Sequence, residues 1–161
     1  MAGFGWQTQR ILTHLDDTGD FYLDQVAQVV MDRWSDGRVR LLGDAAFSAS
    51  PMSGAGTGLA LVGAYMLAGE LAAADWDPVA GFAGYEQRMR SYVEDNQEIG
   101  RMHVQMLTAP EPTAEPSPQP DMAAITALIE RAVGGPELPN YDGLPDTGPL
   151  LGPATTAPTR P

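Results

Sequence analysis

The prolines of this chain are distributed so unevenly that they divide it into parts with different capacities to fold. Only Pro51 and Pro78 lie in the first two thirds of the sequence, and the other twelve of the 14 prolines lie in the last third. Proline donates no amide hydrogen bond and fixes its own φ angle, so a proline-rich run forms neither a helix nor a central strand. The sequence therefore predicts a folded region, an extended proline-rich linker, a short helix with a docking segment, and a disordered tail, over 1–108, 109–120, 121–141 and 142–161 respectively.

Composition excludes several classes of function. The 161 residues carry 21 acidic and 9 basic side chains, a net charge of −12, so the chain has no electrostatic basis for binding nucleic acid or an anionic membrane. The absence of cysteine excludes disulfides, thiolate metal sites and cysteine nucleophiles, and it favours a reducing compartment. We read no signal peptide in the first twenty residues, and we expect a cytoplasmic protein.

Apolar periodicity and turn signals predict a helix-rich α/β chain with two strands and long helices. We expect strands at 21–31 and 39–42, separated by a turn at 35–37, and helices at 5–16, 57–74, 79–107 and 121–133. Asp77 followed by Pro78 is a typical helix start, with a capping carboxylate and a first-turn proline. Glu86 and Arg90 are four residues apart and are expected on the solvated face of the long helix.

One segment of the sequence has the features of a ligand-binding site. A strand ends in a single carboxylate, Asp44, and a loop containing Gly54 and Gly56 then leads into a helix. Open α/β sheets bind ligands beyond the carboxyl ends of their strands, and glycines without a Cβ let backbone approach a bulky group closely. The unpaired N–H groups that begin the following helix stabilise negative charge placed before them. The segment therefore predicts a site for a flat or bulky ligand that develops negative charge.

This segment resembles the second flavin motif of the FAD-dependent aromatic hydroxylases, the flavoprotein monooxygenases similar to para-hydroxybenzoate hydroxylase. The residues that match in type and spacing are Gly43, Asp44, Ala45, Ala46, Pro51, Gly54 and Gly56. The resemblance implies that Asp44 holds a ribityl hydroxyl of FAD, that Pro51 lies over the flavin ring near the substrate, and that residues 54–58 face its N1–C2 edge. The residues implied to bind the cofactor are Gly43, Asp44, Pro51, Gly54, Ala55, Gly56, Thr57 and Gly58, and no catalytic side chain or metal ligand is implied.

The family resemblance also implies an activity and shows what this sequence lacks. Such enzymes use NAD(P)H to hydroxylate an aromatic or polyketide-like small molecule. The sequence departs from the family at four positions: Phe47, Ala55, Gly58 and Gly63 stand where His, Gln, Asn and Asp are usual. It also contains no Gly-x-Gly-x-x-Gly turn to receive the FAD pyrophosphate. We therefore expect the C-terminal portion of a flavin monooxygenase, truncated and inactive alone, which a separate N-terminal chain could complement.

The sequence leaves two other interpretations open, one of its structure and one of its function. Residues 45–69 carry no charge and are long enough to span a membrane, but five glycines, a proline and several hydroxyl side chains favour a packed core helix instead. The alternative function is a non-catalytic remnant or a helical interaction module without bound flavin. His14 and His103 are expected to be packing or surface residues.

Overall fold

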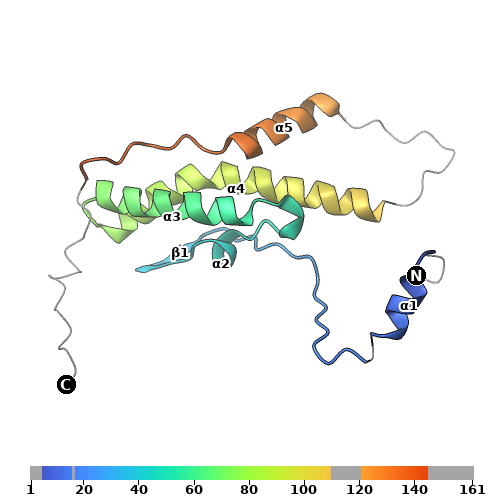
Figure 1. The fold of residues 1–161 in the computed structure, drawn as a ribbon. Coiled ribbons are helices and arrows are strands. Elements are labelled where there is room, and N and C mark those ends of the chain that lie inside the picture. Colours follow the sequence, from blue (N-terminus) through green and yellow to red (C-terminus); the bar gives the residue numbers. More distant parts are fainter. Residues whose placement is uncertain (1–4, 16, 110–120, 145–161) are drawn as a thin grey trace, which may run out of the picture.

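The computed structural model describes residues 5–15, 17–109 and 121–144 (Figure 1). In chain order its elements are helix α1 (Thr8–Thr13), strands β1 (Ser35–Asp36) and β2 (Val39–Arg40), helix α2 (Asp44–Phe47), the 3₁₀ helix η1 (Pro51–Ser53), and helices α3 (Gly56–Ala73), α4 (Pro78–Thr108) and α5 (Met122–Gly134). The expected helix-rich α/β class with two strands is confirmed. The predicted linker, apart from residue 109, and the predicted tail from residue 145 lie outside the described residues.

Helices α3 and α4 lie side by side and form the centre of the fold (Figure 1). Both helices were expected within one or two residues of their observed ends. The largest fully buried side chains fill the space between these helices, the hairpin and α2: Trp34, Phe47, Leu59, Met66, Tyr85, Met89 and Val93. Their burial supplies most of the apolar stabilisation of this region.

The connection between α3 and α4 is only four residues long and makes a sharp reversal. Asp75 and Trp76 both adopt left-handed φ angles of 49° and 64°. The carboxylate of Asp77 then accepts a hydrogen bond from the Val79 amide at 3.0 Å, which confirms the predicted helix cap. Gly81 lets α4 pass close to the backbone of α3, because a Cβ there would lie 2.9 Å from Leu71 Cα.

The predicted strand over 21–31 is wrong. The segment belongs to no strand, because no neighbouring strand in the part of the chain that the structure describes offers it a ladder of hydrogen bonds. The Val29 amide instead donates to the Ser48 carbonyl. The side-chain amide of Gln28 donates to the Gln97 carbonyl, and that of Gln97 donates to the Val29 carbonyl, both at 2.7 Å. The predicted turn at 35–37 overlaps a tight antiparallel hairpin, in which Ser35 pairs with Arg40 and Asp36 with Val39, so the second strand is shorter than expected.

The C-terminal described segment returns along the helices. Helix α5 lies against α4, capped by Asp121 and tied to Asp95 by Arg131 through two 3.0 Å hydrogen bonds. The chain beyond α5 crosses α3, where the Tyr141 ring lies over Gly69. We call residues 136–141 the strap. The Tyr141 hydroxyl donates to Glu70 at 2.6 Å, and the Tyr65 hydroxyl donates to the Pro139 carbonyl at 2.7 Å.

Apart from Thr57 and Glu70, helix α3 carries only apolar side chains, Tyr65 and glycines, and these lie on all its sides. Within the described residues it is the single helix whose length and composition would allow it to cross a membrane. One side is buried against the rest of the fold, through Leu59, Gly63, Met66, Gly69 and Ala72. The other side exposes apolar residues, including Leu61 at 69% and Tyr65 at 45% of their surface. An all-round apolar helix is typical of a protein interior, so this second side is patterned to be covered.

Candidate functional site

Most of the residues expected to bind a ligand surround one hollow of about 410 Å³ at the start of α3. Its wall is formed by Asp44, Ser48, Ala49, Ser50, Pro51, Gly54, Gly56 and Thr57. Five of the eight sequence-predicted residues are in this wall. They come from α2, η1 and the first turn of α3, so three consecutive elements build the site.

Asp44 is the one charged side chain in this wall. It begins α2 directly after Gly43, whose φ of 63° lets the chain turn out of the hairpin. Asp44 is exposed, and no hydrogen bond to its carboxylate occurs within the described residues. A Cβ built on Gly56 would lie 3.9 Å from Asp44 Oδ1, so the carboxylate stands opposite the first residue of α3. It is therefore available to accept hydrogen bonds from a ligand.

The loop between α2 and η1 is held in a strained conformation. Ser50 is buried and has a φ of 70°, a region that side-chain-bearing residues rarely occupy. Its hydroxyl accepts from the Met52 amide at 3.2 Å, and its carbonyl accepts from the Ser53 amide at 3.1 Å. Gly100 on α4 permits the close approach, since a Cβ there would overlap the Ala49 carbonyl. Strain that the surroundings maintain in this way is typical of functional sites.

The first turn of α3 presents unpaired donors to the hollow. Its N-cap residue is Ala55, which has no side-chain acceptor for the first-turn amides. The first intrahelical hydrogen bond at this end runs from the Leu59 amide to the Ala55 carbonyl at 2.9 Å. The amides of Gly56 and Thr57 therefore remain available beside the hollow, where the positive end of the helix dipole stabilises an anion.

Three predicted residues lie outside the wall of the hollow. Gly43 is buried against Ala60, and Ala55 packs partly into the core. Gly58 faces α4, because a Cβ there would lie 3.6 Å from the Tyr92 hydroxyl. Their role is in packing the site together. Gly63, one of the four departures from the family pattern, is also enclosed, so this position has no room for the usual aspartate.

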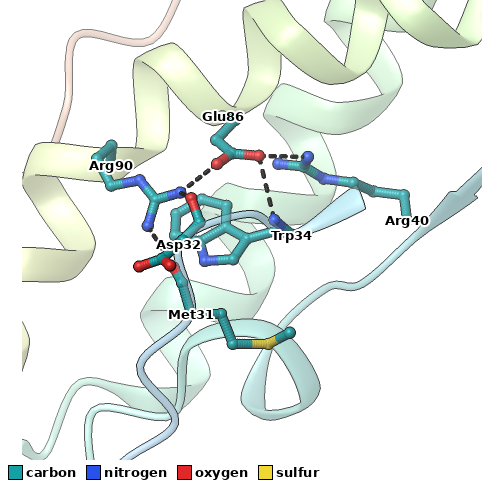
Figure 2. Close-up of polar contacts among 6 residues, drawn as sticks. All are labelled: Met31, Asp32, Trp34, Arg40, Glu86 and Arg90. Carbon is teal, nitrogen blue, oxygen red and sulfur yellow. Dashed lines mark hydrogen bonds and ion pairs between the residues drawn. The ribbon is translucent and has the colours of Figure 1, made fainter. Parts of the chain in front are cut away.

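A charged cluster between the hairpin and α4 was not predicted from the sequence. Glu86 on α4 accepts from the Arg40 guanidinium at 2.7 Å and from the Trp34 amide at 3.3 Å, and it also pairs with Arg90 (Figure 2). Glu86 and Arg90 form the expected pair four residues apart, but both side chains are half-buried and do not lie on the solvated face. The four-residue spacing was visible in the sequence, but nothing in it indicated that Arg40, 46 residues earlier, completes the cluster.

Burial and hydrogen bonding act against each other in this cluster. Burial alone would raise the pKa of the Glu86 carboxyl, but hydrogen bonds from Arg40, the Trp34 amide and Arg90 outweigh it and lower that pKa. Glu86 is therefore ionised at neutral pH. Burial also raises the pKa of the neighbouring Tyr85 hydroxyl to about 12, so this phenol stays neutral.

The hollow fits the ring end of a flavin nucleotide. A carboxylate, a proline and glycine-flanked amides meet there, and the uncapped α3 N-terminus suits a ring that becomes negatively charged on reduction. The described residues contain no cluster of three or more His, Cys, Asp or Glu side chains that could hold a metal ion.

Comparison with known proteins agrees with this reading. Residues 13–107 match the family described as "FAD binding domain". A "Flavin-dependent monooxygenase" from an unknown prokaryotic organism is 42% identical over 137 residues, which are 85% of this chain and 35% of that protein. One from Legionella longbeachae serogroup 1 (strain NSW150) is 38% identical over 139 residues, 86% of this chain and 36% of that protein.

A solved structure shares the fold. The crystal structure of tetracycline destructase Tet(55) superimposes with a TM-score of 0.65 at 40% sequence identity, and the match covers 85% of this chain and 36% of that one. This chain thus spans about a third of the length of the relatives it matches.

Proposed function

The chain belongs to the FAD-binding domain family of the flavin-dependent monooxygenases, and from this we propose that it forms the flavin-ring side of an NAD(P)H-dependent monooxygenase. The proposed reaction is hydroxylation of an aromatic or polyketide-like small molecule. The observation that carries the proposal is the hollow in which the exposed carboxylate of Asp44 stands opposite the uncapped first turn of α3.

In this proposal, different residues in the wall of the hollow contact different parts of FAD. Bound FAD would supply electron transfer from the reduced nicotinamide and the activation of dioxygen. Asp44 accepts a hydrogen bond from a ribityl hydroxyl, and Pro51 offers an apolar surface to the ring. The amides of Gly56 and Thr57 stabilise negative charge on the ring edge, by roughly 0.3–1 kcal/mol for an exposed site and more where water is excluded.

The substrate class rests on relatives and on the chemistry of the hollow. One similar structure is a tetracycline destructase, a name that denotes action on tetracycline. The wall of the hollow combines apolar residues with hydroxyl side chains and a single charge, which suits a flat substrate of limited charge. We propose a planar aromatic or polyketide-like substrate for this chain also.

The exposed side of α3 supports a further part of the proposal. Leu61 and Tyr65 are exposed on the outer side of this helix. The sequence also lacks a Gly-x-Gly-x-x-Gly turn for the FAD pyrophosphate. We propose that the portion of the enzyme that carries this turn covers this side of α3, either as a fused segment or as a separate chain. The absence of cysteine favours a cytoplasmic location.

The test is a titration of FAD followed by flavin fluorescence, with and without the complementing portion. Alone, the chain is expected to bind FAD more weakly than about 1 μM, a value that requires about −8 kcal/mol, and to oxidise no NAD(P)H. The complemented protein should bind FAD and oxidise NAD(P)H. Tight stoichiometric binding by the chain alone would show that it is a complete flavin domain.

Matched substitutions test the site itself. In the complemented protein, Asp44→Ala should weaken FAD binding by about ten- to a hundredfold, since a hydrogen bond to a charged group contributes roughly 1.5–3 kcal/mol. Asp44→Asn should lose less, because the amide oxygen still accepts. Asp75→Asn removes the same charge at the far end of α3, where asparagine tolerates the left-handed φ, and should change nothing. Equal effects of the two Asn variants would contradict the site, and no flavin binding in any form would favour an interaction module.

A further inference from the structure

The β1–β2 hairpin leads directly into the proposed flavin site but is too small to hold its own position. Each strand has two residues, and the hairpin forms a two-stranded sheet with no third strand in the described residues. Isolated hairpins of this size are not stable in water. Side-chain contacts to the helices must therefore fix where the hairpin ends and where Asp44 begins.

We propose that Glu86 is the positioning residue for Asp44, because it clamps both strands of the hairpin from α4. Its carboxylate takes the Trp34 amide just before β1 and the Arg40 guanidinium at the end of β2 (Figure 2). One side chain thus holds both ends of the hairpin. The inference rests on the proposed function, since it assigns the task of Glu86 through the flavin site.

Glu86 neutralises the buried positive charge of Arg40. The Arg40 side chain is only 3% exposed, and its Nε and Nη2 atoms have no hydrogen-bond partner in the described part of the chain. Its guanidinium lies 4.3 Å from the Tyr85 ring centroid and 5.4 Å from that of Trp34. These rings attract the cation, but within the described residues Glu86 supplies the only hydrogen bond and the only ion pair of the Arg40 guanidinium. Without this carboxylate, a buried cation would be left uncompensated.

A short and tightly packed path connects the clamp to the site. The Leu41 amide donates to the Trp34 carbonyl at 2.9 Å, which closes the hairpin. The Leu42 side chain packs against Gly63 of α3, with Cδ1 3.0 Å from the position of a Cβ there. Gly43 then accepts the amides of Ala46 and Phe47, which form α2. A shift of Arg40 is therefore transmitted over three residues to Asp44.

Arg90 provides a matched comparison within the same cluster. It also pairs with Glu86 and stacks on the Trp34 ring, 4.1 Å from its centroid, but its other hydrogen bonds run to the carbonyls of Met31 and Asp32, upstream of the hairpin, and none reaches Arg40. Its removal takes away an ion pair of α4 while leaving the contact between Glu86 and Arg40. A role limited to stability predicts similar effects for both substitutions, whereas a positioning role predicts an effect at α2 for Glu86 alone.

The experiment measures amide hydrogen exchange of the full 161-residue chain, residue by residue, by NMR. The Ala46 and Phe47 amides report on α2, and the Val93 amide in α4 reports on global unfolding. Glu86→Gln should speed exchange at Ala46 and Phe47 by about ten- to a hundredfold relative to Val93, as expected for loss of charge-assisted hydrogen bonds. Arg90→Gln should leave this ratio unchanged. An unchanged ratio in Glu86→Gln would overturn the proposal.

A second background keeps the test decisive if Glu86→Gln unfolds the chain. Arg40→Met keeps an apolar side chain over the aromatic rings and removes the buried charge. In that background, Glu86→Gln should fold and should change exchange at α2 by less than about twofold, since the two residues act as one unit. Equal effects in both backgrounds would overturn the proposal. Neither measurement uses FAD, so failure of the clamp is distinguishable from failure of the flavin site, which the Asp44 titration reports.

Discussion

Gly69→Ala should release the strap from α3. Gly69 is buried in the middle of the helix, and a Cβ at this position would overlap the ring of Tyr141. The ring is part of a rigid aromatic side chain packed 5.3 Å, centroid to centroid, from Tyr65. It cannot move aside and keep this contact, so the alanine methyl and the ring compete for the same space.

The magnitude follows from what Tyr141 contributes. Burying part of the ring contributes about 0.8–1.5 kcal/mol, as half of the value for a fully buried side chain. The aromatic pair with Tyr65 adds about 0.5–1.5 kcal/mol, and the hydrogen bond to Glu70 adds more. Against these, alanine favours the helix by about 1 kcal/mol over glycine. With about 0.5–1.5 kcal/mol for the hydrogen bond, the net expectation is a destabilisation of about 1–3.5 kcal/mol.

The assay is equilibrium unfolding in urea, followed by tryptophan fluorescence. Trp76 lines the same hollow as Tyr141 and should report release of the strap. The control is the background Tyr141→Ala, in which the competing ring is gone. There Gly69→Ala should become stabilising by about 1 kcal/mol, so the sign of the effect reverses. A Gly69→Ala variant that is stabilised equally in both backgrounds would refute the reasoning.

Three further predictions use other parts of the fold. Gly63→Ala should destabilise the chain by about 1–3 kcal/mol in thermal unfolding, because its Cβ would lie 3.0 Å from Leu42 in a filled core; a stabilised variant would contradict the packing described. Burial, and to a smaller extent the hydrogen bond to Glu70, raises the pKa of the Tyr141 hydroxyl. Its contribution to stability is therefore complete below pH ~10 and is lost as the pH rises further. Tyr141→Phe should abolish this alkaline loss of stability in denaturant titrations. The pKa of the Glu86 carboxyl is lowered in the fold, so its contribution to the free energy of unfolding is present above its unfolded pKa and is lost as the pH falls through its folded pKa. The stability difference between the parent chain and Glu86→Gln should therefore shrink on acidification. A difference independent of pH would argue against an ionised cluster.

The long helices could be predicted because their signals are local. Asp77 and Pro78 mark the start of α4, and Phe82, Tyr85, Met89 and Val93 repeat along one buried face. The wall of the hollow could be predicted for a related reason. Its residues are close in sequence, so the spacing from Asp44 to Thr57 already contains most of the geometry.

What could not be predicted depends on partners distant in the chain. An apolar run over 21–31 indicates an extended backbone but does not say which partners its backbone groups will find. The Val29 amide donates to a loop carbonyl, and the Val29 carbonyl accepts from the Gln97 side chain. The task of Glu86 depends on Arg40, which no periodicity connects to it. The orientation of Gly58 toward Tyr92 depends on how α3 rotates against α4, a property of packing and not of spacing.

The helical pair formed by α3 and α4 also sets an order of events during folding. Its two members are joined by four residues, so they can meet with little loss of chain entropy, on the timescale of helix formation and short-loop closure. The contacts that shape the hollow connect residues much farther apart, such as Gln28 with the Gln97 carbonyl and Met52 with His103. We therefore expect a transition state in which the two helices are formed while the α2–η1 loop is still open. Substitutions in that loop should then accelerate unfolding and leave the refolding rate nearly unchanged.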